Sequence, residues 1–212
     1  MKSLVFLSII AFSFDTYGGV FTVPHFVESG SFAIGLEPEL TLTHGAGLGA
    51  NLRYTHGITE FNNLSLFIGT GIGPRRFRLG LDFSFDIFPD VEGQPGIGIA
   101  PHLMYYRVKR TLAVDGVEKV DEGGKFEAGL IPYIHKTFSP KKSEVEPFLA
   151  IPFGMTFEKD LNDTGSLKAV TEAAVVVGSQ FSSSEHFRYT IEIGVAIQNT
   201  ESYVSGGFSF YY

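Results

Sequence analysis

The stretch that most constrains the fold of this chain runs from Arg76 to Phe88 and alternates strictly between two kinds of residue. One row is large and apolar, and it consists of Phe77, Leu79, Leu81, Phe83, Phe85 and Ile87. The other row is polar or small, and it consists of Arg76, Arg78, Gly80, Asp82, Ser84 and Asp86. Only a β-strand, whose side chains point to opposite faces with a period of two, separates the rows so completely. The run is long for a globular strand but suits a tilted strand crossing a bilayer, which needs about 9 to 11 residues.

The same alternation recurs along the chain and predicts an all-β protein. We count ten such runs between Ser31 and Tyr212, joined by short segments rich in Gly, Pro and Asp. Closure of such a sheet removes its two unpaired edges. We therefore expect a closed antiparallel up-and-down transmembrane β-barrel of about ten strands, with eight or twelve as alternatives. A soluble barrel would hold the apolar row inside, but that many large side chains would overfill a small lumen.

Composition and the start of the chain bear on export and on partners. The chain has 212 residues, no cysteine and a net charge of -7, which argues against thiolate chemistry and nucleic-acid binding. Lys2 followed by a short apolar stretch, 4–12, predicts a signal peptide over residues 1–18. Residues 19–212 are then expected to form a single barrel domain.

The connections predict an orientation. If both ends of the barrel lie on the periplasmic side, the two longest connections, Val108 to Gly124 and Lys159 to Ser166, face outward. Asp115-Gly116 inside the first of them is a two-residue hairpin signal, so this connection is expected to be a projecting β-ribbon.

The C-terminus carries a resemblance to a known superfamily. Phe208, Phe210 and Tyr212 alternate up to the last residue. They resemble the closing-strand signal that the outer-membrane assembly machinery of Gram-negative bacteria reads. The whole mature chain resembles the small barrels typified by the membrane domain of outer membrane protein A. The resemblance implies residence in the outer membrane after export through the periplasm, with lipid, lipopolysaccharide and the assembly machinery as partners.

The polar rows predict a charged lumen. The expected lumen-lining residues are Glu37, Glu39, Arg53, Arg76, Arg78, Asp82, Asp86, His102, Glu127, His135, Glu146, Glu172, Arg188 and Glu192. From strand direction we expect Arg76 and Arg78 to meet Glu127, and Arg53 and Arg188 to meet Asp86 and Glu146. The carboxylates then left without an obvious basic partner are Glu37, Glu39, Glu172 and Glu192.

Five prolines conflict with regular strands, because proline cannot donate a hydrogen bond to the sheet. Pro38, Pro101, Pro132 and Pro147 lie in apolar rows, and Pro152 lies in a polar row. We expect a local break or bulge at each, with the facing of residues beyond it open to a slip by one.

No catalytic or metal site stands out. The chain has six histidines, but none has the spacing of a Ser-His-acid arrangement, so we expect no enzyme activity, cofactor or metal. Residues 160–165 match the first half of a calcium loop, yet Thr171 replaces the bidentate Glu, and an ordinary turn explains the pattern better.

Three functions remain open from the sequence. The favoured one is a structural or weakly conducting barrel whose lumen is held by ion pairs. The alternatives are a passive uptake porin for small molecules and a loop-mediated adhesin or receptor, for which the 108–124 ribbon would carry recognition.

Overall fold

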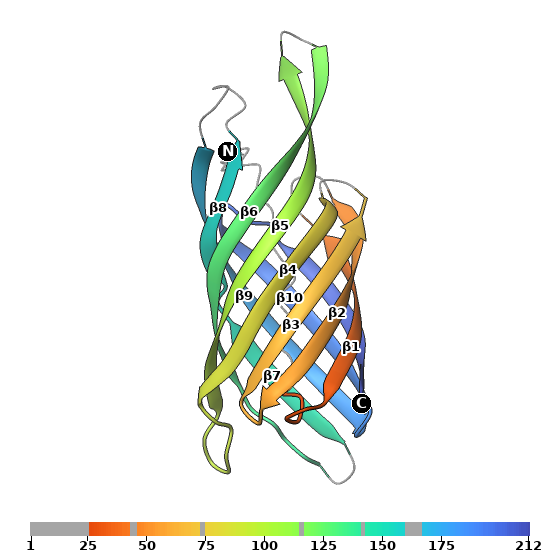
Figure 1. The fold of residues 1–212 in the computed structure, drawn as a ribbon, viewed down its shortest axis with the longest axis vertical. Helices are drawn as coiled ribbons and strands as arrows, with labels where there is room; N and C mark the ends of the chain where they lie inside the picture. Colours follow the sequence, from red (N-terminus) through yellow and green to blue (C-terminus); the bar gives the residue numbers. More distant parts are fainter. Residues whose placement is uncertain (1–25, 43–45, 73–74, 115–116, 141–142, 160–166) are drawn as a thin grey trace, which may run out of the picture.

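The fold is a single antiparallel sheet that closes on itself (Figure 1). The computed structural model describes residues 26–42, 46–72, 75–114, 117–140, 143–159 and 167–212. Its strands are β1 (Phe32–Thr41), β2 (Gly47–Thr59), β3 (Asn62–Gly71), β4 (Arg75–Phe88), β5 (Gly96–Val114), β6 (Val117–His135), β7 (Glu144–Ala150), β8 (Phe153–Lys159), β9 (Leu167–Ser184), β10 (Phe187–Gln198) and β11 (Tyr203–Tyr211). No helix among these residues is long and apolar enough to cross a membrane.

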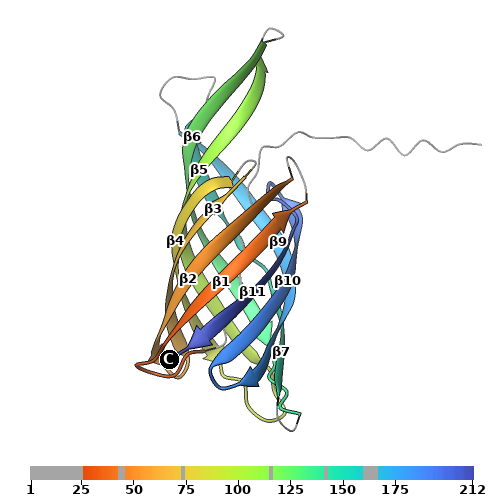
Figure 2. The same cartoon turned by 90° about the vertical axis from the view of Figure 1, so that its right-hand side faces the viewer.

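Closure occurs between the first strand and the last. β1 pairs with β2 on one side and with β11 on the other, which Figure 2 shows directly. β7 and β8 occupy one position in the wall, since both lie between β6 and β9. The eleven named strands therefore make a closed barrel of ten, the number expected from the alternating runs.

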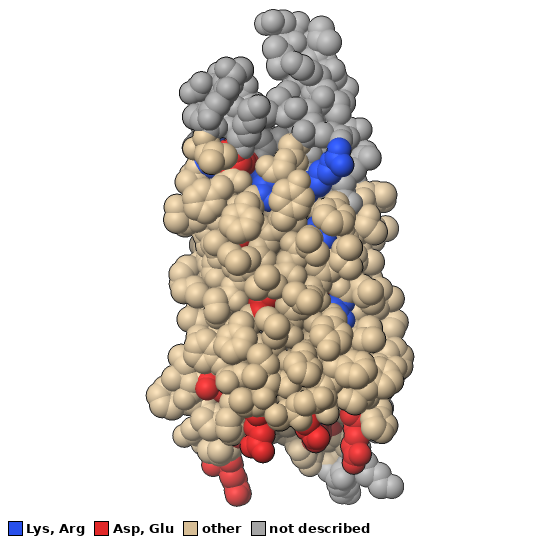
Figure 3. Space-filling model, viewed as in Figure 1, with Lys and Arg blue, Asp and Glu red and all other residues tan. Residues whose placement is uncertain are grey.

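The two rows of each strand face as the alternation predicts. In β1, Glu37 and Glu39 are 4% and 3% exposed, whereas Leu36 and Leu40 are 40% and 42% exposed. Because the sheet is closed, the buried row lies inside and the apolar row forms the outer wall. On the face drawn in Figure 3 this wall is almost uncharged, with Lys and Arg toward one end and Asp and Glu gathered at the other.

At four of the five prolines the strand itself continues, and the expected local break is limited to the pairing on one side, as at Pro38 and Pro101. β7 and β8 are separated at Ile151 and Pro152, and this is the one proline at which a strand ends. Both halves keep a single register against β6 and against β9, so no facing slips. The physical reason is that a strand residue directs its N–H toward one neighbour only, so a proline removes one ladder bond and leaves the other neighbour's pairing intact.

Pro38 illustrates this one-sided loss. It pairs with Ala50 of β2 without interruption, while the pairing with β11 skips from Leu36–Phe208 to Glu39–Ser205 in the same register. The irregularities that do shift the register lie elsewhere, for example between Gly57 and Thr59.

The expected ribbon is present. β5 and β6 pair continuously from Gly96–His135 to Val114–Val117 and extend beyond the other strands (Figure 1). The C-terminus lies at the opposite end of the barrel. There, however, the connections over 89–95 and 136–143 are as long as the 160–166 connection at the ribbon end, so the ribbon alone makes the ends unequal. Residues 1–18, the expected signal peptide, lie outside the described residues, as does the 160–165 segment.

Aromatic side chains form a partial belt on the outer wall at the end that carries the C-terminus. The ring of Phe32 stacks on those of Tyr54 and Tyr212, with centroids 5.9 and 5.2 Å away. Phe210 lies 5.0 Å from Phe187 and 5.9 Å from Phe208. Such belts are typical of membrane interfaces, where the apolar body of the ring meets the polar headgroup layer.

Candidate functional site: the charged barrel interior

Arg53 is the centre of one ion-pair cluster in the first four strands. Its Nε lies 2.6 Å from Glu37 Oε1, and its Nη1 lies 2.7 Å from Asp82 Oδ2. All three side chains are less than a tenth exposed. The guanidinium also lies over the Phe67 ring, 5.0 Å from its centroid. One buried cation thus serves two buried carboxylates, an arrangement that holds β1, β2 and β4 together from inside.

Arg78 makes a second, more deeply buried pair. Its Nη1 lies 2.8 Å from Glu39 Oε2, and the two side chains are 2% and 1% exposed. The contact joins β4 to β1 and therefore passes over β2 and β3. Gly49 of β2 makes room for it, because even a Cβ at that position would lie 3.1 Å from Arg78 Nη2. The small residues of the inward rows are thus required by the large charged ones.

β5, β6 and β8 hold a third group of polar contacts. Glu127 lies 2.9 Å from His102 Nε2 and accepts a hydrogen bond of 2.7 Å from the Tyr106 hydroxyl. Lys125 Nζ lies 3.1 Å from Glu158 Oε2. In the neighbouring strands, Thr156 donates a hydrogen bond of 2.7 Å to Glu172.

At the end of the barrel that carries the C-terminus, His135 lies between two carboxylates. Its Nδ1 is 2.7 Å from Glu146 Oε1 and its Nε2 is 3.0 Å from Asp86 Oδ2. Each ring nitrogen thus faces a carboxylate oxygen, and a doubly protonated ring would donate to both. Nearby, Arg188 Nη2 is 2.9 Å from Glu144 Oε2, and its guanidinium lies over the Tyr211 ring at 5.4 Å.

These contacts correct the expected partners. Arg78 meets Glu39 and not Glu127, and Arg53 meets Glu37 and Asp82 and not Asp86. Glu37 and Glu39 therefore have the basic partners that the sequence did not reveal. The tilt of the strands is the reason, because residues at equal distances along two strands lie at different depths in a barrel.

The remaining expected residues are placed as follows. Glu172 and Glu192 are 4% and 1% exposed on the inner side. Arg76 lies within β4, but its side chain is outside the described part of the structure. Sequence reasoning missed Lys125, Glu144 and Glu158, which extending the alternation of their strands would have found. It also missed Glu201, which precedes β11 and continues the buried row of Tyr203 and Ser205.

Apolar side chains also pack together inside the barrel. The buried cluster consists of Phe67, Ala100, Met104, Tyr106, Ile131, Tyr133, Phe148, Ala150, Val176 and Tyr203. Glycines on adjacent strands make space for its rings. A Cβ at Gly80 would overlap the Phe67 ring, and one at Gly178 would overlap the Phe148 ring. The interior therefore contains a packed apolar cluster beside the ion pairs.

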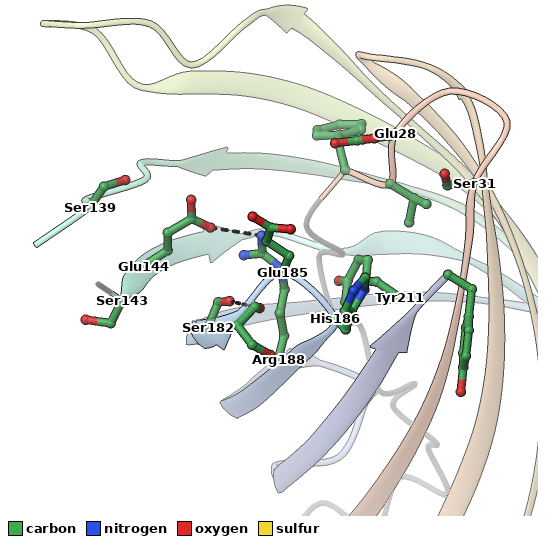
Figure 4. A pocket seen from close by; sticks show the side chains of 14 residues that line it. Glu28, Ser31, Ser139, Ser143, Glu144, Ser182, Glu185, His186, Arg188 and Tyr211 are labelled. Atoms are coloured by element: carbon green, nitrogen blue, oxygen red, sulfur yellow. Dashed lines mark hydrogen bonds and ion pairs between the residues drawn. The ribbon is translucent and has the colours of Figure 1, made fainter. Parts of the chain in front are cut away.

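Two cavities of about 960 Å³ each lie at the end of the barrel that carries the C-terminus. One, drawn in Figure 4, is lined by Arg188, Glu144, Tyr211 and several serines. The other reaches His135, Asp86 and Glu146. Within the described residues, no group of three His, Asp or Glu side chains has the arrangement of a metal site.

Comparison with known proteins gives the fold and no more. No protein-family model matches the chain, and no curated protein sequence matches it. Among solved structures, the COG4313 outer membrane channel from Pseudomonas putida F1 is similar, with a TM-score of 0.53 and 8% identity, over 92% of this chain and 100% of that one. Ail of Yersinia pestis matches with a TM-score of 0.32 and 12% identity, over 86% of this chain and 97% of that one. The chain therefore has the fold of the outer-membrane β-barrels.

Proposed function

We propose that the protein resides in the bacterial outer membrane as a structural or weakly conducting barrel whose interior is held by ion pairs. The observation that carries this proposal is the pairing of buried charges across the lumen, above all Arg53 with Glu37 and Asp82 and Arg78 with Glu39. Paired charges that are shielded from water join the strands from inside, since an open pore would leave such groups to water.

The interior has an acidic excess, which predicts the selectivity of any current. The buried acids among the described residues are Glu37, Glu39, Asp82, Glu127, Glu146, Glu158, Glu172, Glu192 and Glu201. The buried Lys and Arg residues in the same part of the chain are Arg53, Arg78, Lys125 and Arg188. Rings of carboxylates favour cations in other pores, so a small cation-selective conductance is expected.

Single-channel recording of the refolded protein across a salt gradient tests this proposal. We expect a small conductance, or none, and a reversal potential of the sign that cation preference requires. Glu172→Gln with Glu192→Gln should reduce that preference, and Thr190→Ser should leave it unchanged. A large conductance would favour the passive uptake porin instead, and anion preference would contradict the account of the interior.

The projecting ribbon supports a second candidate, a loop-mediated adhesin or receptor. β5 and β6 continue their pairing beyond the barrel to Val114 and Val117, so the ribbon projects past the other strands (Figure 1). Replacing residues 109–122 with a two-residue turn should abolish host-cell or matrix adhesion and leave the barrel folded. Unchanged adhesion would contradict this candidate.

A further inference from the structure

The segment before β1, Phe26–Ser31, turns over the rim of the barrel and returns into its mouth. Gly30 has a φ of 82°, and the Ser31 backbone N–H donates to the Glu28 carbonyl at 2.9 Å, so the chain reverses here. This left-handed conformation costs glycine little, and it directs the residues before the turn toward the interior. We call Phe26–Ser31 the plug segment.

The inner part of the plug segment is buried in the mouth. Val27 is 2% exposed, and its backbone N–H donates to Asn63 Oδ1 of β3 at 3.2 Å. Phe26 packs against the buried apolar cluster, and its ring centroid lies 6.2 Å from that of His135. The segment therefore lies across the opening and contacts the groups that line it.

The outer part is fixed to β2. Gly30 N–H donates to the Gly57 carbonyl at 2.9 Å, Gly57 N–H donates to the Ser31 carbonyl at 3.0 Å, and Ser29 Oγ donates to the Ile58 carbonyl at 3.0 Å. Gly57 has no room for a side chain, because a Cβ there would overlap the carbonyl oxygens of Val27 and Glu28. The position of the segment thus depends on a glycine at residue 57.

The two cavities at this mouth lie on either side of the plug segment. Phe26 lines both of them, and Val27, Glu28 and Ser31 line the one drawn in Figure 4. Each cavity is large enough to hold many waters. The second cavity reaches His135, Asp86 and Glu146, so Phe26 lies beside the path to these groups.

We propose that the plug segment is a regulatory element that closes this mouth of the barrel and limits access to the ion-paired interior. This inference rests on the proposed function, since the path that the segment closes is the one a current would take. The segment is held by a few hydrogen bonds and by the packing of Phe26 and Val27, so it can be displaced without breaking the wall.

Thiol labelling tests the closure without relying on conduction. The chain has no cysteine, and Ser65 is fully buried on β3, one inward position beyond Asn63, so Ser65→Cys is a nearly isosteric reporter. We expect slow reaction with a water-soluble thiol reagent. Gly57→Val should accelerate it by roughly tenfold or more, the shift that an overpacked position produces. Asn63→Ala, which removes the acceptor for Val27, should act in the same direction.

Gly206→Val is the matched control, because a Cβ there makes only an ordinary contact of 3.5 Å with the Thr190 carbonyl. It should leave labelling unchanged, and heat-modifiable migration should show that every variant is folded. If Ser65→Cys reacts equally fast in the Gly57→Val, Gly206→Val and parent backgrounds, the proposal that the plug segment closes the mouth is overturned. If labelling responds and no variant conducts, closure by the segment stands and conduction through the interior is wrong. If the parent conducts and Gly57→Val leaves the current unchanged, the regulatory role is overturned.

Discussion

At the scale of single residues, the interior contains a cation that serves two acids. Arg53 contacts both Glu37 and Asp82, and all three groups are shielded from water. Removing one partner of a buried pair leaves an uncompensated charge, which is far more costly than the pair is favourable. Arg53 is therefore the interior residue whose loss should matter most.

Arg53→Met should lower the free energy of unfolding in lipid by about 3 to 5 kcal/mol, because two buried carboxylates lose their cation. A urea titration would measure this loss of stability, with unfolding followed by circular dichroism or by heat-modifiable migration. Adding Glu37→Gln and Asp82→Asn to the same chain should restore most of the loss. If the Arg53→Met variant is as stable as the parent, water replaces the guanidinium.

A second prediction concerns Asp90, which lies in the 89–95 connection outside the wall. Burial alone would raise its pKa, but hydrogen bonds from Lys136 Nζ at 2.5 Å and from the Thr137 backbone N–H at 2.6 Å outweigh it, so the pKa lies below its ordinary value. A carboxylate with a depressed folded pKa stabilises above its unfolded pKa, and the contribution disappears as pH falls through the folded value.

The link between these two connections should therefore loosen below about pH 4, the ordinary range of an aspartate pKa. Hydrogen exchange over 89–95 and 136–140 would report it. Asp90→Asn should produce at neutral pH the exchange that the parent shows in acid, and Glu92→Gln is the control. Because this pair lies in a connection outside the wall and Lys136 is 27% exposed, the effect on global stability should be small.

The sequence predicts which way a side chain faces but not what it meets. Facing depends on a local period of two, which β1 to β4 keep over most of their length and lose only near the bulges at Gly57 and Phe88. Partners depend on the tilt and stagger of the strands, which set the depth of each residue and are a property of the closed barrel. This is why Arg78 reaches Glu39 three strands away and why Glu37 was expected to lack the partner that Arg53 provides.

At the scale of elements, large and small residues on adjacent strands fit together. Gly80 of β4 lies against the Phe67 ring of β3, with no space for a Cβ. Gly80→Ala should therefore destabilise the barrel by about 1 to 3 kcal/mol, the usual cost of overpacking. Combining it with Phe67→Leu should cost less than the sum of the two single changes in a double-mutant cycle. Additive effects would show that the ring can move aside.

The outer rows should respond to charge according to depth. Leu81→Arg or Ile193→Arg places a cation in the middle of the apolar wall and should cost about 2 to 4 kcal/mol of folding free energy in lipid. Leu167 is the first residue of β9 and is 75% exposed, so Leu167→Arg should lower the folding stability much less. Equal stability of Leu81→Arg and the parent in bilayers would show that this wall does not face lipid.

The prolines show what an element-level rule leaves out. Treating each proline as a strand breaker predicted five breaks, and only at Pro152 does the strand itself end. A strand held from both sides keeps its register through one missing bond, as β1 does at Pro38. Pro152 differs because the skipped pairs involve both neighbours, β6 and β9, and Pro132 lies opposite the same gap.

At the scale of the whole molecule, closure satisfies every strand edge internally and should resist detergent. The folded protein in cold dodecyl sulfate should therefore migrate at a different apparent mass from a boiled sample. Deleting β11 should abolish the difference, because it leaves two open edges. Identical migration of folded and boiled parent protein would contradict a closed barrel.

The pairing of β1 with β11, the seam of the barrel, also determines when the barrel can close during folding. The Ser205 hydroxyl donates to the Pro38 carbonyl across 167 residues of chain, and Pro38 has no N–H to return toward β11. Every other pairing joins strands that are adjacent or nearly adjacent along the chain, so the seam carries the largest loop-closure entropy and one of its weakest stretches of ladder. The seam should be the last pair of strands to form during insertion into the membrane. It should also be the first to separate under force, beginning at the stretch around Pro38.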